Sequence, residues 1–256
     1  MSIQTELTRI TNAKAAIKTA IEGKGVTVPS DTLLDGMASL IESIEAGGGA
    51  TEPYIEEVID GNGDITNATL HGYTIIRNNA FYRCLKLALV SLPSGLTSIG
   101  NNAFNNCTKL ALTRLPSGVT SIGDDAFYNC TNLALTSLPS GVTSIGNSAF
   151  HSCSSLALTS LPSGITSIGI CAFYGCSSLA LTRLPSGITS IGNFAFQNCS
   201  SLASLTFEGK PESISKSAFK ECTNLTTINV PWAPGAVANA PWSAKNATIN
   251  YNFPGA

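Results

Sequence analysis

Residues 172–192 read AFYGCSSLALTRLPSGITSIG, and nearly the same text recurs one repeat earlier and one repeat later. Shifting the chain against itself by 23 residues superimposes seven phenylalanines and seven cysteines. They are Phe81, Phe104, Phe127, Phe150, Phe173, Phe196 and Phe219, with Cys84, Cys107, Cys130, Cys153, Cys176, Cys199 and Cys222. A fixed period in the twenties is typical of a solenoid, in which each unit buries its apolar side only against its neighbours. The chain therefore predicts one stack of similar units.

Each unit can be divided into a turn and two short strands. Phe173 and Cys176 stand three residues apart, which predicts a short helical or 3₁₀ turn. A strand over LALTRLP ends at Pro185, because proline has no N–H for a ladder. Gly187 is expected in the tight turn that follows, because glycine tolerates the positive φ that such turns need. Ile191 is expected on the second strand.

The repeated text resembles the BspA-like leucine-rich repeats, whose 23-residue unit is written roughly A-F-x-x-C-x-x-L-x-x-I-x-I-P-x-x-V-x-x-I-G. The resemblance covers residues 73–230. It implies an α/β-type, right-handed solenoid of short parallel strands and short helical turns. It also implies a protein that binds other macromolecules at surfaces, with a protein or a glycan as the partner.

Four inner units depart from this pattern, because threonine stands where the family has isoleucine and a leucine precedes it. The leucines are Leu112, Leu135, Leu158 and Leu181. Since strand side chains alternate between faces, a regular strand would turn these leucines outward as an apolar stripe, which usually marks an interface. A bulge in each unit would turn them inward and the threonines outward. The sequence leaves both arrangements open.

Positions that vary between units are expected to point outward and to carry binding. One such stripe follows the phenylalanines and contains Tyr82, Asn105, Tyr128, His151, Tyr174 and Gln197. The other lies on the first strand and contains Ser91, Arg114, Ser137, Ser160 and Arg183. We favour the strand stripe, because parallel strands hold side chains in a rigid row about 4.8 Å apart. Arg114 and Arg183 would then bind two acidic groups of one ligand, or act only as solubilising charges.

The cysteines are expected to be buried free thiols that act as small apolar side chains. Repeated cysteines of a solenoid stack in parallel, and bridging them would require their Cβ atoms to turn against the register. Cys171 lies at a variable position and is the one expected to be exposed. Without a close pair of cysteines, and with two histidines in the chain, we expect no metal and no cofactor.

Composition excludes several classes of function. Charged residues make up 12% of the chain and the formal net charge is −2, so nucleic acid is not an expected partner. The sequence contains no run of 18 apolar residues, which is the length that would predict a membrane span. The sequence shows no nucleophile elbow, phosphate-binding loop or paired carboxylates, so we expect a non-enzymatic protein. The first residues lack the apolar run of a secretory signal, which predicts synthesis in the cytoplasm without a signal peptide.

Four segments are expected along the chain. Residues 1–46 predict two amphipathic helices for anchoring or homo-oligomerisation, with apolar residues at helical spacing. Residues 47–53 form a glycine-rich linker, residues 54–230 the solenoid with its N-terminal cap, and residues 231–256 the C-terminal cap. In that last segment Trp232 and Trp242 are expected to close the core rather than to bind a sugar.

Residues 1–46 also resemble N-terminal segments of tail and other structural proteins from bacteriophages of gut bacteria. That resemblance implies a virion component of the tail or fibre type, whose repeats face a host receptor or glycan. The alternative is a bacterial adhesion or interaction protein without a virion, remaining in the cytoplasm or exported by a non-classical route.

Overall fold

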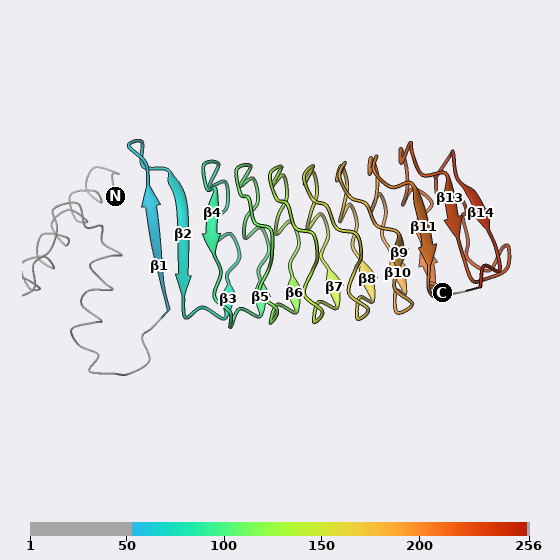
Figure 1. Ribbon diagram of the computed structural model, residues 1–256, viewed down its shortest axis with the longest axis horizontal. Coiled ribbons are helices and arrows are strands. Elements are labelled where there is room, and N and C mark those ends of the chain that lie inside the picture. The colour runs from blue at the N-terminus through green and yellow to red at the C-terminus, as the bar shows by residue number, and fades with distance from the viewer. Residues whose placement is uncertain (1–52, 255–256) are drawn as a thin grey trace, which may run out of the picture.

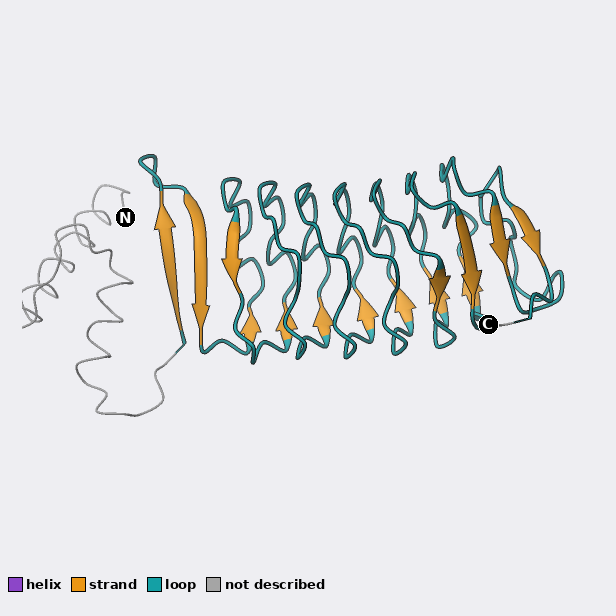
Figure 2. Ribbon diagram, in the orientation of Figure 1, coloured by secondary structure: helices purple, strands orange, loops and turns teal. Residues whose placement is uncertain are grey.

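The computed structural model describes residues 53–254, which form one elongated stack of coils running from a hairpin at one end to β14 at the other (Figure 1). Most of each coil is turn and loop, and the strands are short (Figure 2). The first sheet contains β1 (Tyr54–Ile59), β2 (Ile65–His71) and β4 (Leu89–Ser91). The second contains β12 (Ser213–Ile214), β10 (Ser190–Ile191), β8 (Ser167–Ile168), β7 (Ser144–Ile145), β6 (Ser121–Ile122), β5 (Ser98–Ile99) and β3 (Ile75–Ile76). The third contains β14 (Thr248–Asn250), β13 (Thr227–Asn229), β11 (Ser204–Phe207) and β9 (Arg183–Leu184).

The seven-stranded sheet runs along one side of the stack. Its strands are parallel, and five successive pairs place a serine opposite a serine and an isoleucine opposite an isoleucine. The isoleucines are buried in the core. Paired residues lie 23 positions apart in most of the sheet, so the 23-residue period of the sequence sets the register of strand pairing.

The opposite side of the stack is less regular than the sequence predicts. A first strand forms in the outer units as β4, β9, β11 and β13, but between β4 and β9 no strand is present in residues 92–182 on this side. In these inner units two consecutive exposed residues, such as Thr136 and Ser137, separate two buried leucines. This two-residue excursion is a bulge, and it breaks the alternation that a strand requires.

The helical or 3₁₀ turn predicted between each repeat phenylalanine and cysteine is wrong, because no helix forms anywhere in residues 53–254. Six of the seven repeat phenylalanines instead lie between two residues of left-handed backbone, as Phe104 does between Asn102 (φ 55°) and Asn106 (φ 63°), and Phe219 is followed by one, Glu221. The amide of Asn105 donates to the carbonyl of Asn102 (3.1 Å), and that of Cys107 donates to the carbonyl of Phe104 (3.0 Å). A left-handed residue stops helix propagation, so the unit makes separate tight turns.

Stacked rings form the centre of the core. Neighbouring phenylalanines of the repeat lie with ring centroids 5.2–5.5 Å apart and planes within 10° of each other. Beside them, six cysteines donate their thiol hydrogens to phenylalanine carbonyls, as Cys130 does to Phe104 at 3.0 Å. A buried thiol therefore has a polar partner as well as an apolar surrounding.

The two ends of the stack are closed differently. At the C-terminal end Trp232 and Trp242 are buried against Phe207 and Phe219. At the N-terminal end the β1–β2 hairpin extends the first sheet, and Lys86 lies 2.8 Å from carboxylate oxygens of both Asp60 and Asp64 in its turn. The predicted helical pair over residues 1–46 lies outside the described residues.

The thiols are expected to differ sharply in reactivity. Burial raises the pKa of Cys130 far above its ordinary value and that of Cys107 to about 12, so the reactive thiolate is scarce at neutral pH. Cys84 is half-buried, contrary to the expectation for the repeat cysteines, and Cys171 is half-buried as well. Brief labelling of the native protein with a maleimide, read by mass spectrometry, should modify only these two. Modification of a third cysteine before unfolding would contradict a closed core.

Candidate binding surface

The strand stripe lies at the surface, where the sequence places it. Its five residues occupy equivalent positions of successive units, and all are exposed. They are Ser91, Arg114, Ser137, Ser160 and Arg183. Exposed Thr113, Thr136, Thr159 and Thr182 precede the last four, and together these nine residues are called the strand face. The face is rich in hydroxyl groups and has one arginine near each end.

The leucines are not part of this surface. Leu135 and Leu158 are fully buried, Leu181 is 1% exposed, and Leu112 is half-buried. The bulge turns them inward, and the carbonyls of three of them accept hydrogen bonds from the next unit, as Leu135 does from Ala157 (3.1 Å). The outward apolar stripe is therefore wrong, and the bulged alternative is confirmed.

The two arginines differ in their surroundings. Arg183, on β9, lies 3.5 Å from the carboxylate of Glu208, and its backbone pairs with Thr206 of β11. No described carboxylate lies within 4 Å of Arg114. Arg114 is thus available to an acidic group, whereas Arg183 would exchange one acidic partner for another.

Beyond Arg183 the surface continues as a polar network. The side-chain amide of Asn229 donates to the hydroxyl of Thr206 (3.0 Å), and that of Asn250 donates to the side-chain oxygen of Asn229 (2.8 Å). These contacts between neighbouring strands hold the side chains in fixed positions. A fixed polar row loses less entropy on binding than a mobile one.

The stripe that follows the phenylalanines is only partly available for binding. Asn105 and Gln197 are buried, with 8% and 7% of their surfaces exposed, which corrects the expectation that every variable position points outward. Between them, His151 is stacked on Tyr128 and on Tyr174, with ring centroids 4.5 Å apart in both cases. Burial lowers the pKa of His151, although the charge of Asp125 opposes the shift. The rings mostly cover one another, so this stripe stabilises the stack.

Sequence reasoning missed a row of acceptors at the edge of the seven-stranded sheet. The side-chain oxygens of Asn78, Asn101, Asp124 and Asn147 each accept the backbone N–H of the equivalent residue one unit later. The Asn or Asp that follows most of the Ser-Ile-Gly sequences was the available signal. Ile170 interrupts this row and is 52% exposed.

The described residues contain neither a group of three metal-ligating side chains nor a helix that could cross a bilayer. The surface therefore offers hydrogen-bonding and ionic chemistry from the hydroxyl groups and arginines of the strand face.

The model of the BspA-type leucine-rich repeat region matches residues 74–169 and 157–237, in 6 copies. The chain belongs to the BspA-type leucine-rich repeat family. The matched residues include the whole strand face, so the candidate surface is made by BspA-type repeats throughout.

Several solved structures are similar to this chain. A leucine-rich repeat protein of T. pallidum is 31% identical, with a TM-score of 0.54, over 67% of this chain and 87% of its own. A leucine-rich cell surface protein from Faecalibacterium prausnitzii is 22% identical over 72% of each chain, with a TM-score of 0.47. A leucine-rich repeat protein from Bacteroides ovatus is 19% identical over 80% of this chain and 76% of its own, with a TM-score of 0.35. The comparison with curated proteins gives no match.

Proposed function

We propose that the protein is a non-enzymatic binding protein that holds a macromolecular partner on its strand face. The observation that carries the proposal is the row of exposed hydroxyl groups with Arg114 near one end, a cation without a described acidic partner. Three repeats separate Arg114 from Arg183, which is roughly 14 Å at the spacing of parallel strands. An extended partner with acidic groups at that separation fits both ends of the face.

The partner we propose is an acidic glycan or an acidic protein segment on a cell envelope. Hydroxyl side chains bind sugar hydroxyls and peptide groups equally well, and the arginines add ionic contacts to carboxylates. Formal net charge is −2, so affinity arises from this local arrangement rather than from a general positive field.

Replacing both arginines tests the surface. Arg114→Ala with Arg183→Ala should weaken binding to host cells or envelope glycans about tenfold or more, since charged hydrogen bonds contribute about 1.5–3 kcal/mol each. Lys109→Ala with Lys216→Ala is the matched control, because it removes the same charge from exposed positions outside the strand face. Equal binding by the two double variants, each with an unchanged melting temperature, would remove the strand face from consideration.

Two biological settings are compatible with this function. In the first, residues 1–46 anchor or oligomerise the protein in a phage virion of the tail or fibre type, as their resemblance to phage structural proteins implies. In the second, the protein is a bacterial adhesion or interaction protein, which is supported by its likeness to the T. pallidum repeat protein. Neighbouring tail, portal or holin genes would favour the virion, and a neighbouring export system would favour the adhesin.

A further inference from the structure

At the N-terminal end of the stack the core side chains Ile76 and Phe81 are buried, but apolar residues beside them are exposed. Ala80 is exposed, whereas the equivalent alanines of the next six units are fully buried. Among the described residues, eight large apolar side chains are exposed, and six of them lie between residues 58 and 89. They are Val58, Ile59, Ile75, Tyr82, Leu85 and Leu89. Of these six, Ile75 lines a cavity, beside the exposed Ala80.

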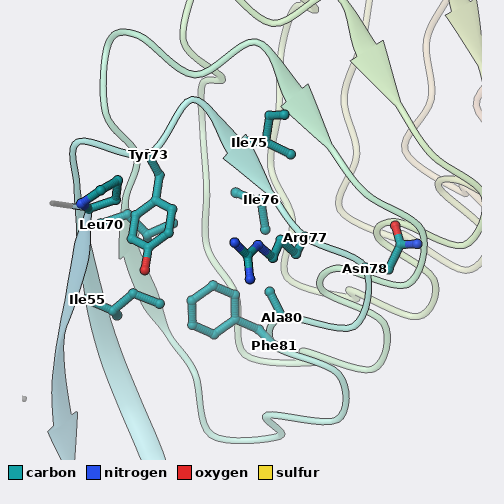
Figure 3. A pocket seen from close by; sticks show the side chains of 10 residues that line it. Ile55, Leu70, Tyr73, Ile75, Ile76, Arg77, Asn78, Ala80 and Phe81 are labelled. Atoms are coloured by element: carbon teal, nitrogen blue, oxygen red, sulfur yellow. The ribbon is translucent and has the colours of Figure 1, made fainter.

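A cavity of about 540 Å³ opens at this end. It lies between the β1–β2 hairpin, which contributes Ile55 and Leu70, and the first unit, which contributes Phe81 (Figure 3). The hairpin extends the first sheet through β4, but within residues 53–254 β3 pairs with β5 alone. The cap therefore covers one side of the first unit and leaves the edge of β3 open.

The cavity has a charge as well as an apolar lining. Arg77 lines it, and no described carboxylate lies within 4 Å of its guanidinium. A suitable occupant therefore offers several aliphatic side chains together with a carboxylate.

The N-terminal segment of the same chain is attached beside this cavity. Pro53, the first described residue, lines the cavity, so the preceding chain is covalently attached at its rim. Within them, residues 33–45 read LLDGMASLIESIE, with six large apolar residues, three carboxylates and no basic residue. Residues 3–22, by contrast, contain both Arg9 and Lys14. Ile41 lies twelve positions before Pro53. Twelve residues of extended chain span up to about 40 Å, so Ile41 can reach any part of the cavity.

We propose that residues 33–45 of the same chain dock in the cavity beside β3 and complete the N-terminal cap. Their aliphatic side chains cover the exposed Ile75 and Ala80, and one of their carboxylates pairs with Arg77. Because the segment is covalently attached, its effective concentration at the cavity is high, which favours it over a second molecule.

Thiol protection tests the docking in the full-length chain. A cysteine is placed at Ile75 in one variant and, as a control, at Ser213 in another, which is exposed at the far end of the same sheet. The Ile75→Cys thiol should react with a maleimide about tenfold more slowly than the Ser213→Cys thiol, as an attached segment would protect it. Adding Leu34→Asp and Leu40→Asp should restore fast labelling of Ile75→Cys and leave Ser213→Cys unchanged. Equally fast labelling at both sites, with no effect of the aspartates, would overturn the proposal.

Cross-linking identifies the occupant. In a chain with Ile75→Cys and Leu40→Cys, oxidation should give a monomer closed by an internal disulfide, resolved by its shifted mobility without reductant. A disulfide-linked dimer as the sole product would overturn the proposal and assign the cavity to a second copy of the protein. Neither outcome depends on the strand face, so this test is independent of the proposed binding function.

Discussion

Replacing Gly146 by alanine is expected to destabilise the protein by about 3 kcal/mol, at the upper end of the effect of an overpacked core. A Cβ atom on Gly146 would lie 2.6 Å from the carbonyl carbon of Gly123 and 2.7 Å from the amide nitrogen of Asp124. Both atoms belong to the backbone of the preceding unit and cannot move aside as a side chain would. The two units would have to separate, and the strand pairing between β6 and β7 would weaken.

Gly164→Ala is the matched control for this experiment. A Cβ atom there would meet its nearest neighbours at 3.9 Å, which is ordinary contact. Its effect should lie within about 0.5 kcal/mol of zero, on the stabilising side, because alanine restricts the unfolded chain. Urea unfolding of both variants measures the difference. Equal midpoints would mean that the units do not stack as closely as described.

Phe127→Ala is expected to have the largest effect of a side-chain truncation, about 3–5 kcal/mol. The ring is fully buried between Phe104 and Phe150, with centroids 5.3 Å and 5.5 Å away. Its removal leaves a cavity that two neighbouring units share. Since each unit is stabilised only through its neighbours, the loss would divide the stack into two weakly coupled halves.

Tyr128→Ala provides the comparison, because it removes a ring of similar size from the adjacent residue. Tyr128 is half-buried and is stacked on His151 near the surface, so the expected loss is about 1 kcal/mol. Thermal unfolding followed by circular dichroism would rank the two variants. A loss at Tyr128 as large as that at Phe127 would contradict a core centred on the phenylalanines.

Much of the fold could be predicted from the repeat alone. When a residue type recurs every 23 positions in a stack, each copy meets its own equivalent in the next unit. This is why Phe127 and Cys130 could be assigned to the core, and why Arg114 and Ser137 could be assigned to the surface. The turn around each phenylalanine could not, since a 3-residue apolar spacing fits a helical turn and two left-handed turns equally well.

The candidate site shows the same division. The sequence by itself determined the period, the residues that stack and the exposed positions of the strand face. Only the tertiary structure decided that Leu135 points inward, because one bulged residue reverses the face of every side chain that follows. It also decided that Arg183 meets Glu208 of the next unit, while Arg114 has no described acidic partner. The physical reason is that a repeat specifies contacts between equivalent residues. The backbone register and the exact distance between two unlike residues depend instead on how the units pack.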